Sequence, residues 1–203
     1  MVKKLLFFLL FLTVNVLTAQ DPSGLTLSEA RPFCSDSGAQ FPNTYDGSTA
    51  VETLPDYGCL FPQLRKNPTW YFLKIETSGN LDLKLISYTS NDVRMDTDFI
   101  AWGPFSEDLF NEIINNGDGQ ELTGDKIIGC EKSTSRPFEE DIIINAALVD
   151  EYYIVMIANF SGDEGYSTLE EQNPNDPNTG TTDCFVNDAP TITSTAVTEA
   201  TED

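Results

Sequence analysis

Three aspartates, Asp92, Asp96 and Asp98, occur in one short segment of the chain. Side chains alternate between the two faces of a strand, so Asp96 and Asp98 are expected on the same face, about 7 Å apart. Two carboxylates held this close repel each other, and Ca²⁺, which takes about six to eight oxygen ligands, is the usual extracellular counter-ion. The spacing therefore predicts a weak Ca²⁺ site formed by Asp96 and Asp98, to which Asp92 could contribute. The alternative is a solvated strand end in which Arg94 is the counter-ion.

The same carboxylates suggest a second kind of chemistry, the hydrolysis of glycosidic bonds. A glycosidase needs an acid and a base or nucleophile about 5–10 Å apart in an aromatic-lined cleft. Asp98 with Trp102 and Tyr71 fits this loosely, because a chain with 33 Asp and Glu residues offers many such pairs. A sugar could also stack on Trp70, Tyr71 or Trp102, although aromatic residues within strands usually pack in the core. A carbohydrate-active enzyme or its sugar-binding accessory domain is therefore the alternative hypothesis.

Composition excludes several other functions. The 203-residue chain contains no histidine, so Ser-His-Asp or Cys-His catalysis and histidine-ligated zinc or haem are not available to it. Its 33 acidic residues against 11 basic ones give a net charge of −22, which repels phosphate backbones. A nucleic-acid partner is therefore not expected.

The first residues have the pattern of a secretory signal peptide. Lys3 and Lys4 precede the apolar run Leu5–Leu12, and Leu17–Ala19 ends on a small residue, which predicts cleavage after Ala19. The alternative, a transmembrane anchor, needs a longer apolar core. Cleavage would remove two lysines and change the net charge from −22 to −24. We expect a secreted or cell-surface protein with no transmembrane span after cleavage.

Four widely spaced cysteines, Cys34, Cys59, Cys130 and Cys184, accompany this signal. Zinc sites usually need clustered ligands, so in an exported protein these cysteines predict two structural disulfides. Four cysteines allow three pairings, and the sequence does not distinguish them. We favour Cys34–Cys59 with Cys130–Cys184, because each bridge would tie a loop-rich end to the sheet.

Most of the chain between residues 69 and 158 has the pattern of β-structure. Strands are predicted where apolar and β-branched residues alternate with polar ones, or run continuously, between turn residues: 69–75, 81–85, 98–102, 141–145 and 152–158. Ser78–Asn80 is expected to join the first two strands as an antiparallel hairpin. Gly103-Pro104 is expected to end the third strand. The last strand is apolar on both faces, which is typical of the centre of a sheet.

One helix is expected directly after the third strand. Ser106 can cap it, acidic residues fill its first turn, apolar residues between 109 and 114 recur on one face, and Asn116-Gly117 ends it. Short strands separated by turn signals, together with one helix, predict a mainly β fold. The expected architecture is an antiparallel jelly-roll-like β-sandwich.

Six segments, in their order along the chain, resemble an N-terminal module of large secreted or surface repeat proteins of Bacteroidota: Gly58–Leu60, Asn67–Ile75, Asp96–Phe105, Glu151–Ile154, Asn159–Ser161 and Thr182–Cys184. The resemblance covers most of residues 32–184. The order of strands and aromatic residues is also similar to that of the bacterial pre-peptidase C-terminal domain, a small non-catalytic β-sandwich. The resemblance implies a non-catalytic module of an adhesin-like protein.

The last residues, 188–203, have two possible interpretations. Ile192 and Val197 resemble the anchors of the first strand of a cadherin-like or immunoglobulin-like repeat, and such a strand cannot fold without the rest of its sandwich. The alternative is a Thr-rich disordered tail. The expected organisation is therefore a signal peptide, an N-terminal linker, a β-sandwich module, and a linker or truncated repeat, at residues 1–19, 20–31, 32–187 and 188–203.

These observations together predict a function without catalysis. We expect an exported β-sandwich module of a cell-surface or secreted adhesin-like protein that binds an extracellular protein or glycan. The expected cofactor is at most Ca²⁺, and the alternative remains the carbohydrate-active protein.

Overall fold

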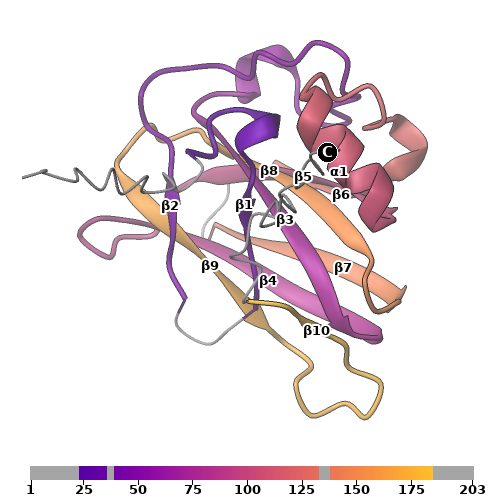
Figure 1. Ribbon diagram of the computed structural model, residues 1–203. Coiled ribbons are helices and arrows are strands. Elements are labelled where there is room, and N and C mark those ends of the chain that lie inside the picture. Colours follow the sequence, from indigo (N-terminus) through magenta and orange to yellow (C-terminus); the bar gives the residue numbers. More distant parts are fainter. Residues whose placement is uncertain (1–22, 36–38, 133–137, 185–203) are drawn as a thin grey trace, which may run out of the picture.

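The computed structural model describes residues 23–35, 39–132 and 138–184. These residues form two β-sheets packed face to face, and α1 (Glu107–Asn116) lies with irregular chain over the outer face of the first sheet (Figure 1). The predicted mainly β sandwich with an α-helix is confirmed for this part of the chain. The predicted signal peptide (1–19) and the predicted C-terminal strand or tail (188–203) lie outside the described residues.

The two sheets differ in size and in strand order. The first has the order β1-β3-β8-β5-β6, with β10 also paired to β3, and the second has the order β2-β9-β4-β7. Every pairing is antiparallel except that of β1 with β3. The strands of the first sheet are β1 (Arg31–Pro32), β3 (Pro68–Thr77), β5 (Thr97–Phe105), β6 (Ile127–Glu131), β8 (Tyr152–Asn159) and β10 (Thr181–Thr182). Those of the second are β2 (Phe41–Asn43), β4 (Gly79–Thr89), β7 (Glu139–Ala147) and β9 (Gly165–Glu171), and three short 3-10 helices occur at η1 (Leu27–Glu29), η2 (Pro62–Leu64) and η3 (Gly124–Lys126).

The first sheet is buried on both faces. Alternate residues of β3, β5 and β8 point into an inner core shared with β4 and β7, among them Tyr71, Phe99 and Val155. The residues between them point into an outer core that is closed by α1, η1 and the irregular chain, among them Trp70 and Trp102. This explains why β8 is apolar throughout, and it confirms that β8 lies at the centre of its sheet, between β3 and β5.

The predicted hairpin between the first two strands is wrong. β3 pairs with β8 in the first sheet, whereas β4 pairs with β7 and β9 in the second, so the chain crosses between sheets at Ser78. The crossing is tight, since a Cβ atom on Gly79 would lie 2.3 Å from the backbone nitrogen of Gly180. The burial pattern gives the physical reason, because β3 needs cover on both faces and β4 alternates between core and solvent.

The third predicted strand does not end at Gly103-Pro104. β5 continues through this pair to Phe105, with a register shift between Trp102 and Phe105. A Cβ atom on Gly103 would lie 2.3 Å from Cδ1 of Tyr153, so glycine allows the aromatic ring of the neighbouring strand to pack against the backbone.

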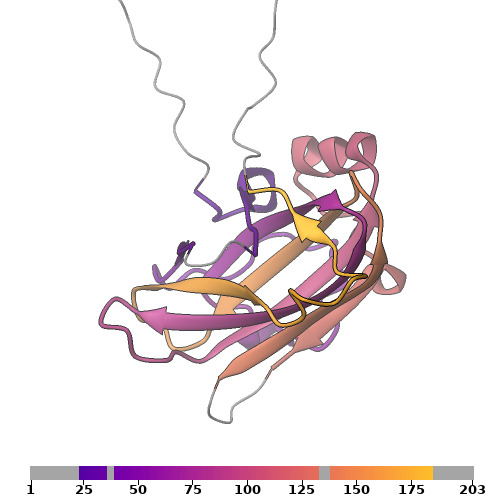
Figure 2. The same cartoon turned by 90° about the horizontal axis from the view of Figure 1, so that it is seen from below.

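Two disulfides are present, but the favoured pairing is wrong. The bonds join Cys34 to Cys184 and Cys59 to Cys130. β1 and β10 both pair with the same edge of β3, which brings Cys34 and Cys184 to a Cα–Cα distance of 5.3 Å (β10 is the yellow strand in Figure 2). Cys130 lies on β6, where the irregular chain carrying Cys59 crosses the outer face of the sheet.

The predicted helix is confirmed in its bounds and caps. The backbone nitrogen of Leu109 donates to Oγ of Ser106, and Gly117 closes the helix in the left-handed conformation with φ of 65°. Phe110 stacks on Tyr152 of β8, with ring centroids 4.3 Å apart. The apolar face of α1 thus covers the outer core, and its C-terminal end lies beside η1.

Candidate functional site

Two of the three predicted aspartates line a common cavity. Asp96 and Asp98, together with Leu64, Lys132 and Phe160, surround a cavity of about 190 Å³ at the edge of the outer core. Asp98 is only 4% exposed. The expectation from strand alternation, that these two side chains share one face, agrees with this arrangement.

Burial sets the electrostatics of this pair. Burial and, to a smaller extent, the charge of Asp96 raise the pKa of Asp98 to about 7, although Lys132 acts in the opposite direction. Burial also raises the pKa of Asp96. A carboxyl group whose charged form is this unfavourable keeps its proton to a higher pH than an exposed one.

Asp92 takes part in a different contact. Its carboxylate accepts a hydrogen bond from the hydroxyl of Tyr166 at 2.7 Å, and the Tyr166 ring stacks on Tyr88 on the second sheet. Arg94, the predicted counter-ion, pairs with Glu139. No group of three or more His, Cys, Asp or Glu residues that could hold a metal ion occurs within the described ranges. The Ca²⁺ prediction is therefore restricted to Asp96 and Asp98.

The three aromatic residues considered for sugar stacking lie in the cores. Trp70, Tyr71 and Trp102 have no exposed surface. The two indole rings stack on each other in the outer core, with centroids 5.9 Å apart. Core packing is confirmed for these residues, and a sugar cannot stack on them.

A long irregular segment, residues 44–67, covers one end of the outer core (Figure 1). It is fixed in place by the Cys59–Cys130 disulfide and by Nε1 of Trp102, which donates to the carbonyl of Asp56 at 3.0 Å. Within the segment, the guanidinium of Arg65 lies 3.8 Å from the centre of the Tyr57 ring. We call residues 44–67 the covering loop.

The covering loop has several exposed apolar side chains. Val51 is 68% exposed and Leu54 is 54% exposed, and Tyr45 and Phe61 are also exposed. Apolar side chains that remain exposed on a fixed segment are available to contact another molecule.

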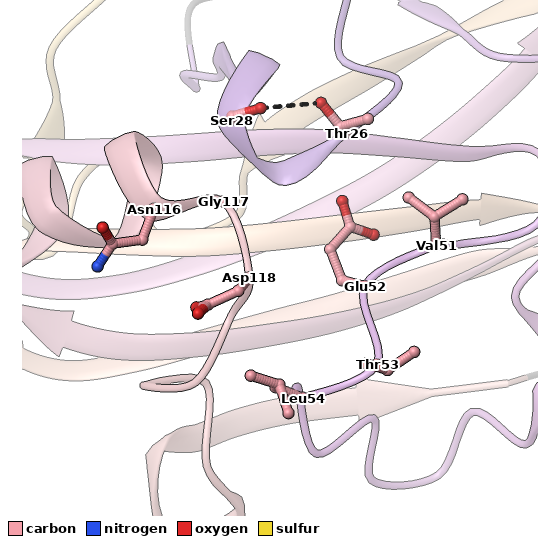
Figure 3. Close-up of a pocket in the computed structure, with 9 residues that line it drawn as sticks. All are labelled: Thr26, Ser28, Val51, Glu52, Thr53, Leu54, Asn116, Gly117 and Asp118. Atoms are coloured by element: carbon pink, nitrogen blue, oxygen red, sulfur yellow. Dashed lines mark hydrogen bonds between the residues drawn. The ribbon is translucent and has the colours of Figure 1, made fainter.

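A groove of about 430 Å³ lies between the covering loop, η1 and the C-terminal end of α1. Figure 3 shows its lining, which comes from Thr26 and Ser28, from residues 51–54, and from residues 116–118. We call it the α1 groove. Its two carboxyl groups belong to Glu52 and Asp118.

Glu52 is the most buried side chain of the α1 groove, at 7% exposure. Its Oε1 atom accepts a hydrogen bond from the backbone nitrogen of Leu27 at 2.8 Å. Its Oε2 atom is buried and has no hydrogen-bond partner among the described residues. Burial raises the pKa of Tyr57, whose hydroxyl donates to the Glu52 carbonyl, and the negative charge of Glu52 adds to this effect.

Reasoning from sequence missed this site. Glu52 lies in a segment without periodicity, and no pattern in the sequence pairs it with Asp118. Only the neighbouring exposed apolar residues, Val51 and Leu54, could have drawn attention to it.

A search of protein-family models found no match to this chain, and a search of curated proteins also found none. The described residues include no helix that is both long and apolar enough to span a membrane. Two disulfides fit an extracellular protein.

Proposed function

We propose that this chain is an exported, non-catalytic β-sandwich module of a cell-surface or secreted adhesin-like protein, and that it binds an extracellular protein or glycan. The observation that supports this most directly is the covering loop, a long irregular segment that a disulfide fixes to the sandwich while its apolar side chains stay exposed. Binding residues are found disproportionately on loops that a rigid scaffold positions.

The length and fixation of the covering loop strengthen this reasoning. Long loops are uncommon in compact domains and are usually functional, and within residues 44–67 the only helix is the short η2. Exposed apolar residues on a preorganised segment lose little conformational freedom on binding, so more of the contact energy contributes to affinity. The two disulfides and the predicted signal peptide support an extracellular location.

A carbohydrate-active enzyme is the second candidate, and the Asp96–Asp98 pair is what favours it. The pKa of Asp98 is raised to about 7 by burial, which suits a general acid near neutral pH. The cavity beside the pair is only about 190 Å³, and the aromatic residues expected to hold a sugar are buried. Binding without catalysis is therefore the better supported proposal.

The test combines binding arrays with a hydrolysis screen on the chain after signal cleavage. We expect saturable binding to at least one glycan or extracellular protein, and no turnover of polysaccharides. The double variant Val51→Ser/Leu54→Ser should weaken this binding at least about tenfold, since it removes both exposed side chains from the covering loop.

A matched control is available on another loop. Leu148 and Val149 are 58% and 52% exposed, and they follow β7 beside Ser78. Leu148→Ser/Val149→Ser should leave binding unchanged. Equal losses in both double variants would contradict a role of the covering loop, and polysaccharide turnover that disappears in Asp98→Ala would replace the proposal with the enzyme.

A further inference from the structure

We propose that the α1 groove receives a lysine or arginine side chain of a partner protein, with its cationic end beside Glu52 and its aliphatic stem between Val51 and Leu54. This deepens the proposed function by naming the chemistry of the partner, and it rests on that function.

Glu52 has an unused acceptor. One carboxylate oxygen is bound by the backbone of Leu27, and Oε2 has no hydrogen-bond partner within the described part of the chain. A buried carboxylate that lacks a partner is unfavourable, whereas a cation that donates a hydrogen bond to it is strongly bound. In Figure 3 the Glu52 carboxylate points toward η1, into the space that Ser28 and Asp118 also border.

The rest of the α1 groove is also suited to a cation. Asp118 supplies a second carboxylate, and no lysine or arginine is among the lining residues. The C-terminal end of α1 reaches the groove at Asn116, and its last turn contains no basic residue. The carbonyl groups at this end of the helix carry partial negative charge. The hydroxyls of Thr26 and Ser28, whose oxygens lie 3.1 Å apart, offer further acceptors.

The apolar part of the groove distinguishes a side chain from a metal ion. A metal ion would use only the oxygen ligands of the groove, whereas a long cationic side chain can use both its two carboxyl groups and its apolar edge. Val51 and Leu54 are exposed at its edge, where they can cover a methylene chain. Lysine and arginine bury such stems against apolar surface while the charged end reaches a polar partner.

The strong negative charge of the whole chain favours a basic partner protein. A net charge of −22 attracts positively charged surfaces and increases the rate at which they meet this protein. A free small amine would gain the same charge contacts but not the contacts of a peptide backbone with the exposed covering loop. We therefore assign the groove to a side chain of a protein.

The test uses NMR titration of the ¹⁵N-labelled chain after signal cleavage. The probe is the blocked peptide Gly-Leu-Lys-Leu-Gly, and the matched probe is the same peptide with its lysine Nζ acetylated. We expect saturable shifts of the amide signals of residues 26–28, 51–54 and 116–118 with the first peptide and none with the second. Glu52→Gln keeps the shape and should weaken binding about tenfold, which corresponds to a loss of about 1.4 kcal/mol.

Glu112→Gln is the matched control, because Glu112 is exposed on α1 and does not line the groove. It makes the same change in net charge and should leave the affinity unchanged. If Glu52→Gln fails to fold, Asp118→Asn replaces it, since Asp118 is exposed and lines the same groove. Equal binding of the acetylated peptide, or equal loss in Glu112→Gln, would overturn the proposal.

Two further experiments distinguish a protein side chain from a free amine, and the groove assignment from the proposed function. If 1,5-diaminopentane binds as tightly as the lysine peptide, the partner-protein assignment is wrong. If the lysine peptide does not bind while an array ligand does, the groove assignment fails and the proposed function stands. If no array ligand binds, the proposed function fails independently of the peptide result.

Discussion

Asp98 couples the stability of this protein to pH. Its folded-state pKa of about 7 lies above the ordinary value of 3.8, so the folded state binds the proton more tightly than the unfolded state does. The stability that the protonated carboxyl contributes is therefore fully present below about pH 4 and is lost as the pH rises toward 7.

We predict that Asp98→Asn flattens this part of the stability profile. The melting temperature of the variant should exceed that of the wild type by several degrees at pH 8, and the difference should shrink toward pH 5. Asp163→Asn, an exposed change of the same type, controls for the reduced net charge. Parallel profiles for Asp98→Asn and Asp163→Asn would show that Asp98 is not responsible.

Calcium is expected to act on the same pair of residues. Asp96 and Asp98 line one cavity, and binding of Ca²⁺ would neutralise carboxylates whose charge is unfavourable. We predict an affinity of about 10⁻⁴–10⁻³ M, as in other extracellular modules, and a melting temperature that rises more with Ca²⁺ than with Mg²⁺.

Asp98→Asn should remove most of this rise. Asp92→Asn should leave it intact, because Asp92 is hydrogen-bonded to Tyr166 and does not line the cavity. Calorimetry with Ca²⁺ and with NaCl at matched ionic strength tests for specific binding. Equal increases of the melting temperature in the two salts would show charge screening and no Ca²⁺ site.

Among residues, those on regular strands could be predicted best. Strand alternation was enough to place Asp96 and Asp98 together, and strand position was enough to bury Trp70 and Trp102. Glu52 could not be predicted, because its burial depends on η1 and the covering loop, which come from separate parts of the chain.

At the scale of elements, the covering loop depends on one disulfide. Cys59 and Cys130 are separated by 71 residues, so their bond restricts the unfolded chain strongly. We predict that Cys59→Ser/Cys130→Ser lowers the free energy of unfolding by about 4 kcal/mol. Limited proteolysis should then cut the covering loop before it cuts the strands. Uncut covering loop in a folded double variant would show that contacts such as the Trp102–Asp56 hydrogen bond hold it without the disulfide.

Helices and strands with strong local signals were predicted correctly, whereas weakly patterned strands and the pairing between strands were not. The helix has a cap, an apolar face and a C-terminal glycine, all of which are local features of the sequence. β9 and β6 were missed, because the former alternates weakly and the latter is short and only partly buried. The turn residues of Ser78–Asn80 suggested a hairpin. That prediction failed because β3 buries both of its faces and β4 buries only one, so the two strands belong to different sheets.

At the scale of the whole molecule, the sandwich class could be predicted from the sequence and the assembly of its layers could not. Continuous apolar strands require cover on both faces, but the cover comes from α1, η1 and the covering loop, which have little periodicity in common. The disulfide pairing follows from this assembly, because β1 and β10 meet only through β3.

The Cys34–Cys184 bond also determines how the molecule responds to mechanical tension. Cys34 and Cys184 are 150 residues apart in sequence and lie near the two ends of the described chain. A force applied across the ends passes through this covalent bond and bypasses the strands from β2 to β10, so stretching can detach only the residues before Cys34, which include η1 and β1.

Single-molecule stretching can test this load path directly. We predict that the oxidised module releases at most about 40 Å, from the residues before Cys34. Cys34→Ser/Cys184→Ser should release about 270 Å, because the 71-residue separation closed by Cys59–Cys130 stays locked and about 80 of the 150 residues extend. Reduction of both bonds should release about 500 Å. Between Cys34 and Cys184 the module would therefore keep its fold under a load that extends the chain on either side of it.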